Sequence, residues 1–269
     1  MLDIRSKLAR AWEVSGTCLC VGLDPIIERM PGELANSPHP VLAFNRYIVD
    51  LVADRVAAFK PQFAHHAAVG AEEDLAQTIA YIRDRSPHAL VILDAKRGDI
   101  GSTAEMYARE AFERYDADIV TINPLMGDDT VIPFLRRADR GAAVLCRTSN
   151  PDAGRFQTAD VAGEPLFLAV ARRAEQVWNR LGNVMLVVGA TAPKEMSAVR
   201  NVAPNLAILA PGFGEQGGSG EQIVRAGRRA DGLGLFVSAS RSVLYAGGAD
   251  QIVRAVDDAR RALDPSLVA

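Results

Sequence analysis

The chain has 269 residues, of which 49% are hydrophobic and 6% aromatic, and its formal net charge is −3. This weakly acidic balance argues against a nucleic-acid or anionic-membrane partner, and three cysteines, an odd number, argue against a disulfide framework. The charged start Met1–Arg5 is unlike a signal peptide, and no apolar run reaches the length of a membrane span. We expect a soluble, cytoplasmic protein with one domain over residues 1–269.

Short apolar runs alternate with helical patterns along the whole chain. A lead-in amphipathic helix is predicted over Leu2–Val14. Eight runs with strand character follow: Thr17–Leu23, Val56–Lys60, Ala89–Asp94, Asp118–Asn123, Ala142–Arg147, Asn183–Val188, Leu206–Ala210 and Leu233–Val237. The helical patterns after the lead-in helix are Val41–Ala53, Glu72–Arg85, Ser102–Tyr115, Asp129–Ala138, Pro165–Leu181, Pro193–Asn201, Gly220–Gly227 and Asp250–Leu263. Eight such units in about 250 residues predict an α/β fold, the (β/α)8 TIM barrel of parallel strands.

A doubly wound open sheet is the alternative fold, but the turn after the first predicted strand lacks a Gly-x-Gly-x-x-Gly pattern. Two long segments, Asp24–Pro40 and Ser149–Glu164, are rich in Pro, Gly and Asn, and we expect loops that cover a site. Cys18 and Cys20 lie in a predicted strand without a second Cys or His pair at metal spacing. They are therefore predicted to be small core residues and not metal ligands.

The segment Leu90–Ile100 joins a buried strand to a cluster of charges. Its apolar run is followed by Asp94, Lys96, Arg97 and Asp99. Side chains repeat with period two on a strand, so Asp94 and Lys96 are expected on the same side. Buried charges are costly unless their neighbours compensate them. The pattern is compatible with a structural ion pair at a barrel end or with an active-site array of opposite charges.

Polar residues follow the predicted strands at the ends where the active sites of such barrels lie. They are Asp24, Lys60, Asp94 with Lys96, Asn123, Thr148 with Ser149, Gly212 with Gln216, and Ser240 with Arg241. The opposite ends of the predicted strands begin with ordinary loop residues. This asymmetry favours the active-site interpretation of the charged segment.

The last two units carry the pattern of a phosphate site. The glycine-rich segment 210–218 follows the seventh predicted strand, and Arg241 follows the eighth within the segment 238–242. Glycines let backbone N–H groups approach an anion closely, and an arginine adds a charge-assisted contact. Because barrels often bind phosphate at these two loops, a phosphorylated ligand is predicted.

The segment 94–103, Asp-Ala-Lys-Arg-Gly-Asp-Ile-Gly-Ser-Thr, resembles the signature of the orotidine 5′-monophosphate decarboxylase family, in particular its longer bacterial branch. The similarity spans nearly the whole chain. It includes Leu23-Asp24, Phe59-Lys60-Pro61, Thr121-Ile122-Asn123-Pro124, Thr148-Ser149-Asn150-Pro151, Gly189-Ala190-Thr191 with Pro193, Pro211-Gly212-Phe213-Gly214, Gln216-Gly217-Gly218 and Ser240-Arg241-Ser242. The signature alone is shared loosely with related sugar-phosphate lyases, whereas the combination is much more selective.

The resemblance implies decarboxylation of orotidine 5′-monophosphate (OMP) to UMP, the last step of UMP synthesis, by a homodimer without metal or cofactor. It also implies a role for each matching residue. A charged tetrad would consist of Lys60, Asp94, Lys96 and Asp99, with Lys96 as the proton donor, and the neighbouring subunit's site would receive Asp99, Ile100 and Thr103. The ribose hydroxyls would be held by Asp24 and Lys60, the pyrimidine by Ser149, and the phosphate by Gln216 and Arg241. Pro193 would lie in a loop that closes over the pyrimidine. His65 and His66 stand where relatives are expected to carry an aromatic–acidic pair, and are interpreted as lying behind the site or on the surface.

The implied chemistry suits these residue types. Loss of CO2 from the pyrimidine C6 leaves a carbanion that no adjacent carbonyl delocalises, so fixed charges must stabilise it. An ammonium beside C6 can do so and then protonate it, while neighbouring carboxylates keep that ammonium charged.

Two other functions stay open at this point. A metal-dependent sugar-phosphate lyase or aldolase on the same barrel would need an acid beside Asp94 to hold Mg2+, and Lys60 and Asn123 at the neighbouring strand ends are not obvious candidates. A non-catalytic nucleotide-binding barrel would have no reason to bury alternating charges.

Overall fold

The computed structural model describes residues 2–214, 219–264 and 266. Eight parallel strands close into a barrel in the order β1-β10-β9-β8-β5-β4-β3-β2, which confirms the predicted TIM-barrel fold. The strands are β1 Leu19–Leu23, β2 Ala58–Pro61, β3 Leu90–Arg97, β4 Ile119–Ile122, β5 Gly141–Arg147, β8 Val184–Val188, β9 Ala207–Pro211 and β10 Leu235–Ala239. A separate antiparallel hairpin, β6 Asp160–Val161 with β7 Glu164–Pro165, lies outside the barrel.

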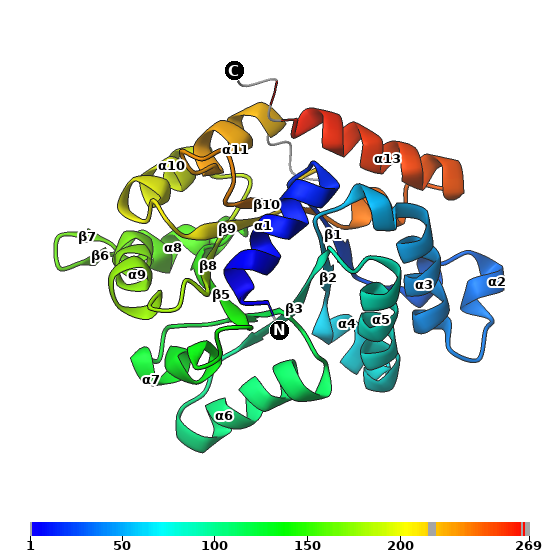
Figure 1. Ribbon diagram of the computed structural model, residues 1–269, viewed down its shortest axis with the longest axis horizontal. Helices are drawn as coiled ribbons and strands as arrows, with labels where there is room; N and C mark the ends of the chain where they lie inside the picture. The colour runs from blue at the N-terminus through cyan, green and yellow to red at the C-terminus, as the bar shows by residue number, and fades with distance from the viewer. Residues whose placement is uncertain (1, 215–218, 265, 267–269) are drawn as a thin grey trace.

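Helices surround the barrel on its outer side (Figure 1). The longer ones are α3 Pro40–Val52, α5 Glu72–Arg85, α6 Gly101–Arg109, α9 Leu166–Arg173, α10 Pro193–Val202, α11 Gly220–Gly227 and α13 Ala249–Ala262. Because these helices cover one side of the sheet and the barrel interior covers the other, the strands are buried on both sides, and β1, β8 and β10 are buried at every residue. The strands therefore read as continuous apolar runs without alternation.

Three predicted helices change character before they end. The range Ser102–Tyr115 is α6 followed by a π-helical turn over Glu110–Arg114, and Pro165–Leu181 is α9 followed by a π-helical turn over Ala174–Trp178. The range Asp129–Ala138 is only α7 Asp128–Val131 with a 3-10 turn over Ile132–Leu135. Pro133 lies inside this last range, and proline cannot continue an α-helix because it lacks the backbone N–H.

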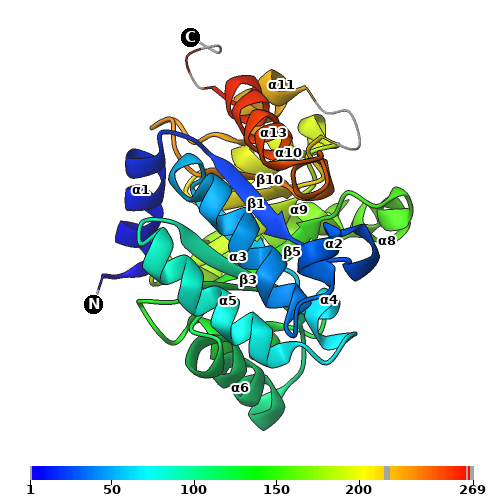
Figure 2. The same ribbon diagram turned by 90° about the vertical axis from the view of Figure 1, so that its right-hand side faces the viewer.

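The lead-in helix α1, Ile4–Ser15, crosses the amino-terminal end of the barrel. In Figure 2 it lies at one end of the strands, and the short helices α2, α4 and α8 lie at the other. The Trp12 Nε1 donates a hydrogen bond to the Leu235 carbonyl at 2.8 Å, and the Trp12 ring stacks on Phe236 with ring centroids 4.6 Å apart. Helix α1 thus covers the amino-terminal end of the barrel and is held there by an aromatic contact with β10.

The amino-terminal strand ends, which begin with ordinary loop residues in the sequence, also carry a buried group of charges. The Asp118 carboxylate, 2% exposed, lies 2.8 Å from Lys7 Nζ and 3.1 Å from Arg83 Nη2, and Arg140 is buried beside it. Asp118 also accepts the Val91 backbone N–H at 3.0 Å. Its partners come from α1, α5 and the entry to β5, so only the closed barrel brings these charges together.

The two long segments predicted as loops contain short elements at the carboxyl-terminal end. The first holds a 3-10 turn over Ile27–Arg29 and α2 Gly32–Ala35. The second holds a 3-10 turn over Pro151–Ala153, α8 Gly154–Gln157 and the β6–β7 hairpin. The remaining short elements are α4 Phe63–Ala67, a 3-10 turn over Ala53–Arg55 and α12 Arg241–Leu244.

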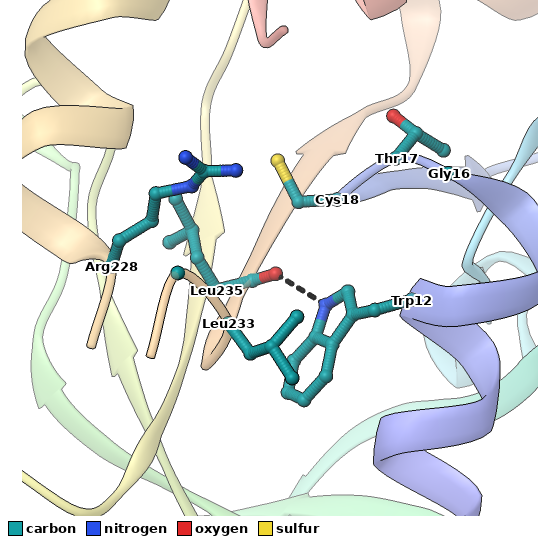
Figure 3. Close-up of a pocket in the computed structure, with 8 residues that line it drawn as sticks. Trp12, Gly16, Thr17, Cys18, Arg228, Leu233 and Leu235 are labelled. Carbon is teal, nitrogen blue, oxygen red and sulfur yellow. Dashed lines mark hydrogen bonds between the residues drawn. The ribbon is translucent and has the colours of Figure 1, made fainter. Parts of the chain in front are cut away.

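A cavity of about 170 Å³ lies at the amino-terminal end, beside α1 (Figure 3). Trp12, Cys18, Arg228, Leu233 and Leu235 are among its lining residues. Burial raises the pKa of the Cys18 thiol to about 12, so this thiol is not a nucleophile at neutral pH. All three cysteines are free and buried, which confirms the prediction of core residues for two of them. The predicted site residues lie at the other, carboxyl-terminal end of the strands.

Candidate active site

A second cavity, of about 200 Å³, opens at the carboxyl-terminal ends of the strands. Its lining consists of six of the predicted positions and three further residues of the last two units: Asp24, Lys60, Ser149, Gly212, Ser240 and Arg241, with Pro211, Phe213 and Ser238. These residues follow or end strands that are far apart in the sequence. The closed barrel therefore brings the phosphate-type segments and the charged strand ends to one place.

Alternating charges form a continuous chain beside this cavity. Lys60 Nζ lies 3.9 Å from Asp24 Oδ1 and donates a hydrogen bond to Asp94 Oδ2 at 3.1 Å. Lys96 Nζ donates to the other oxygen, Asp94 Oδ1, at 2.6 Å. The side chains of Lys60 and Asp94 are 6% and 9% exposed, whereas that of Lys96 is 49% exposed. Lys96 is thus the most exposed member of this array, and neither Lys96 nor Asp94 is among the residues that line the cavity.

The proximity of opposite charges overrides the cost of burial. Burial by itself would lower the pKa of Lys60, but the Asp94 and Asp24 carboxylates outweigh it and raise this pKa above its ordinary value. Burial would likewise raise the pKa of Asp94, and Lys60 and Lys96 together hold it well below its ordinary value. Both groups are charged at neutral pH, as an electrostatic site requires.

The backbone at Lys96 departs from the regular strand from which its position was predicted. Its φ is 45°, in the left-handed region, and the register between β3 and β4 shifts between Leu93 and Arg97. The Thr121 hydroxyl accepts the backbone N–H of Ala95 at 3.0 Å and that of Lys96 at 2.9 Å. A non-glycine residue in this conformation costs energy. The pair with Asp94 forms as expected, but through this turned backbone.

Sequence reasoning missed two residues that contact Asp94. Thr121 Oγ1 donates to Asp94 Oδ1 at 2.9 Å, and Gln62 Nε2 donates to Asp94 Oδ2 at 3.0 Å. Each carboxylate oxygen of Asp94 therefore accepts one lysine and one neutral donor. In the sequence, Thr121 lies within the family motif Thr121-Ile122-Asn123-Pro124 and Gln62 directly follows Phe59-Lys60-Pro61, so both stand next to a functional strand end.

Asp24 presents an unused acceptor. Its Oδ1 is buried and has no hydrogen-bond partner in the described part of the chain, although the cavity lies beside it. Buried polar atoms without a partner are rare, and such an atom beside a cavity fits a hydroxyl donor on a ligand.

The absence of a Cβ at Gly22 makes room for Ser240, because a Cβ there would lie 1.9 Å from Ser240 Oγ.

The predicted phosphate segments border the same cavity. Gly212 and Gly214 both have φ of 95°, a conformation that side chains rarely adopt. Arg241 is the first residue of α12, separated from β10 by Ser240, and it lines the cavity. Gln216, the other predicted phosphate ligand, lies outside the described residues.

The remaining predicted residues lie away from this chain's own charge array. Asp99 accepts the Ile100 backbone N–H at 2.8 Å, and no ion pair from Asp99 to Lys60 or Lys96 occurs within the described residues. Ile100 is 52% exposed, and Thr103 is exposed on the first turn of α6.

Two other predicted positions are also outside the cavity lining. Pro193 begins α10, and Asn123 is exposed, with its side chain accepting the Leu125 backbone N–H at 3.0 Å. Ser149 does line the cavity, and it is packed against Gly189, where a Cβ would lie 2.8 Å from the Ser149 backbone. The neighbouring Thr148 instead bonds Gln157.

The described residues contain no group of three or more His, Cys, Asp or Glu side chains placed to hold a metal ion. Each oxygen of Asp94 accepts a lysine ammonium group, whereas a divalent cation such as Mg2+ is held by several oxygen ligands. Among the described residues no helix is long and apolar enough to cross a membrane.

Comparison with known proteins agrees with this geometry. A family profile described as "Orotidine 5'-phosphate decarboxylase / HUMPS family" matches residues 17–256. Orotidine 5'-phosphate decarboxylase of Ralstonia pickettii (strain 12J) is 51% identical over 240 residues, 89% of each chain. The protein of that name from Cellvibrio japonicus (strain Ueda107) is 49% identical over 251 residues, 93% of this chain and 92% of the relative.

A solved structure extends the similarity to the whole fold. The structure of Leishmania donovani OMP decarboxylase has a TM-score of 0.86 and 34% identity, covering 99% of this chain and 98% of that chain. The similarity thus includes the strand ends as well as the barrel. With a matching profile, relatives at about half identity and a barrel whose charged strand ends converge on one cavity, this chain belongs to the orotidine 5'-phosphate decarboxylase / HUMPS family.

Proposed function

We propose that this protein decarboxylates OMP to UMP in pyrimidine biosynthesis. The observation that carries this function is the chain Asp24–Lys60–Asp94–Lys96 beside a cavity that ends at Arg241. Family membership and relatives named orotidine 5'-phosphate decarboxylase support the same reaction.

In this mechanism the bond between C6 and the carboxylate carbon breaks, CO2 leaves, and the electron pair stays on C6. The Lys96 ammonium lies closest to the open side of the charge array and stabilises the developing carbanion. Lys96 Nζ then delivers one proton to C6, and UMP is formed. Asp94 pairs with Lys96 and positions it before the reaction, while Lys60 and Lys96 together hold Asp94 ionised.

Substrate binding is assigned to the residues around the cavity. The unpartnered Oδ1 of Asp24, with Lys60 beside it, accepts a ribose hydroxyl. Ser149 hydrogen-bonds the pyrimidine, and Arg241 with Gln216 binds the phosphate. Pro193 lies at the start of α10, at the end of a loop that closes over the base. Phosphate binding remote from C6 supplies energy that can hold the charged groups in their costly arrangement.

We further propose that the active unit is a homodimer in which Asp99, Ile100 and Thr103 complete the partner's site. The support is an apolar surface around these residues: Ile100, Met106, Leu125 and Met126 are each at least half exposed. Met126 lies against the Gly98 turn, so this surface is continuous with the charged segment. Exposed apolar surface of this kind marks interaction sites.

The two alternative functions are not favoured. A metal-dependent lyase would place a divalent cation on Asp94, whose two oxygens already bind Lys60 and Lys96 at 3.1 and 2.6 Å. A non-catalytic nucleotide-binding barrel would gain nothing from the energetic cost of burying these charges. We also propose that residues 1–269 act as one barrel domain in the cytoplasm, where the three buried free thiols would stay reduced.

The test is a spectrophotometric assay of purified protein with OMP, following the absorbance change as OMP becomes UMP. We expect turnover with OMP that EDTA does not reduce, and far weaker turnover with orotidine, which lacks the phosphate. Absence of turnover with OMP would refute the proposed function, and loss of activity in EDTA would favour the metal-dependent lyase.

A further inference from the structure

Gln62 connects the charge array to a buried polar network behind the barrel. It follows β2 directly and precedes α4. Its side-chain Nε2 donates to Asp94 Oδ2 at 3.0 Å, its backbone N–H donates to the Leu23 carbonyl at 3.1 Å, and it forms an isolated parallel bridge with Asp94. Gln62 is therefore held against β1 and β3 through its backbone while its amide reaches the carboxylate.

A fully buried histidine fixes this glutamine from the other side. His66 Nδ1 lies 2.9 Å from the Gln62 carbonyl oxygen, and His66 Nε2 lies 3.1 Å from Asn45 Nδ2. A carbonyl oxygen only accepts, so Nδ1 carries the proton, and Nε2 accepts from the Asn45 amide. Burial lowers the pKa of His66, which agrees with this neutral form. The second amide hydrogen of Asn45 goes to Thr78 Oγ1 at 3.1 Å.

The direction of these hydrogen bonds is thus determined from helix α3 to the active site. Asn45 on α3 donates to His66 on α4, His66 donates to the Gln62 backbone, and Gln62 donates to Asp94. Asn45 and His66 are 0% exposed. Both amide hydrogens of Asn45 and both ring nitrogens of His66 have partners, while Asn45 Oδ1 has none in the described part of the chain. These buried hydrogen bonds hold His66 and Gln62 in one arrangement.

We propose that Gln62 is a positioning residue for decarboxylation, which holds the Asp94 carboxylate in the plane that directs Lys96 toward the substrate, and that His66 holds Gln62. This inference rests on the proposed function of the same site. Asp94 Oδ1 receives Lys96 and Thr121, whereas Oδ2 receives Lys60 and Gln62. Without the Gln62 side chain, the Asp94 carboxylate is free to rotate about its Cβ–Cγ bond toward Lys60. Such a rotation displaces Asp94 Oδ1, the oxygen to which Lys96 is bound.

The consequence is a specific kinetic pattern. Gln62 is not among the residues that line the cavity, so its loss leaves ribose and phosphate binding intact. The orientation of Lys96 matters most in the transition state, so the loss falls on kcat. A merely structural role would instead lower stability and leave kcat of the folded protein unchanged.

The first test compares Gln62→Met with Gln77→Met, the same substitution at a half-buried glutamine on α5. We expect Gln62→Met to lower kcat about tenfold or more, as the loss of a hydrogen bond to a charged group does. KM for OMP and the Kd of UMP should stay within about twofold, and Gln77→Met should match the wild type. A Gln62→Met enzyme with wild-type kcat, or one in which only KM rises, would overturn the inference.

Two variants at His66 test how Gln62 is held. Asparagine can place a donor near the position of Nδ1 and so keep the bond to the Gln62 carbonyl, whereas glutamine can replace only Nε2. We expect His66→Asn to retain most of kcat and His66→Gln to lose it severalfold, with urea unfolding curves recorded for both. The reverse order would refute the role of His66, and if neither variant folds, Gln62→Met alone decides. If the wild type is active on OMP and kcat of Gln62→Met equals that of the wild type, only this inference is refuted. If the wild type is inactive on OMP, the proposed function on which the inference rests is refuted.

Discussion

Replacement of Asp94 by asparagine is the perturbation that most directly probes the buried charges. The carboxylate accepts four hydrogen bonds, from Lys60, Lys96, Thr121 and Gln62. An asparagine amide has one acceptor oxygen and one NH2 group. The two donors that now bind one of the carboxylate oxygens would therefore face the NH2 group, which is itself a donor. Lys60, whose side chain is 6% exposed, would keep Asp24, at 3.9 Å, as its only carboxylate partner within the described residues.

The expected loss of stability follows from the burial of the Lys60–Asp94 ion pair. Removing one partner of a buried ion pair leaves an uncompensated charge and costs about 3–5 kcal/mol. We expect this decrease in the unfolding free energy of Asp94→Asn at pH 7, together with loss of turnover. Removing both charges in Lys60→Met/Asp94→Asn should cost less than the sum of the two single losses, because no unpaired charge remains.

The pH dependence has a defined sign. The folded-state pKa of Asp94 is depressed from 3.8, so its contribution to stability is present above that value and is lost only as pH falls through the folded-state pKa. The pKa of Lys60 is raised from 10.5, so its contribution is present below 10.5 and is lost as pH rises through the folded-state pKa. The difference in unfolding free energy between the wild type and Asp94→Asn should therefore be constant from about pH 5 to 9 and become smaller above pH 10.5.

Urea denaturation of the wild type, both single variants and the double variant measures these free energies. Asp54→Asn, an exposed acid on the 3-10 turn Ala53–Arg55, is the matched control and should stay within about 0.5 kcal/mol of the wild type. Asp94→Asn with wild-type stability, or strictly additive losses in the double variant, would refute the reasoning about a buried, mutually compensating pair.

Three further predictions concern the assigned roles. Lys96→Ala should abolish turnover but keep the wild-type unfolding curve and UMP affinity, since its side chain is half exposed; near-native activity would contradict its role as proton donor. Arg241→Ala should weaken UMP binding about 10- to 100-fold, measured by calorimetry, with little effect on uridine; equal losses for the two ligands would remove the phosphate assignment. Ile100→Asp places a charge in the exposed apolar surface and should give monomers in analytical ultracentrifugation with a large loss of kcat; a fully active monomer would contradict a shared site.

Local pattern was sufficient for the barrel because the apolar runs of its eight strands are buried on both sides. The eight predicted runs agree with β1–β5 and β8–β10 to within two residues at nearly every end. The errors are local and have local causes, such as Pro133, which ends α7 early. The positions of Asp24, Lys60 and Asp94 at the carboxyl-terminal ends followed directly from the strand assignment.

Contacts between distant segments were outside the reach of any local pattern. The Lys7–Asp118 pair joins residues 111 positions apart, and the histidine network joins α3, α4 and α5. Nothing near Gln62 in the chain indicates that its amide meets Asp94, and nothing near Lys96 indicates a left-handed backbone.

By itself, the sequence determined the eightfold alternation, the end of the barrel that carries the chemistry and the residue types available there. Only the tertiary structure decided which oxygen of Asp94 each donor occupies, which lysine is buried and which is open to a ligand. The physical reason is that burial and hydrophobic periodicity are properties of neighbouring residues. Hydrogen-bond geometry and the balance of charges depend instead on distances across the closed barrel.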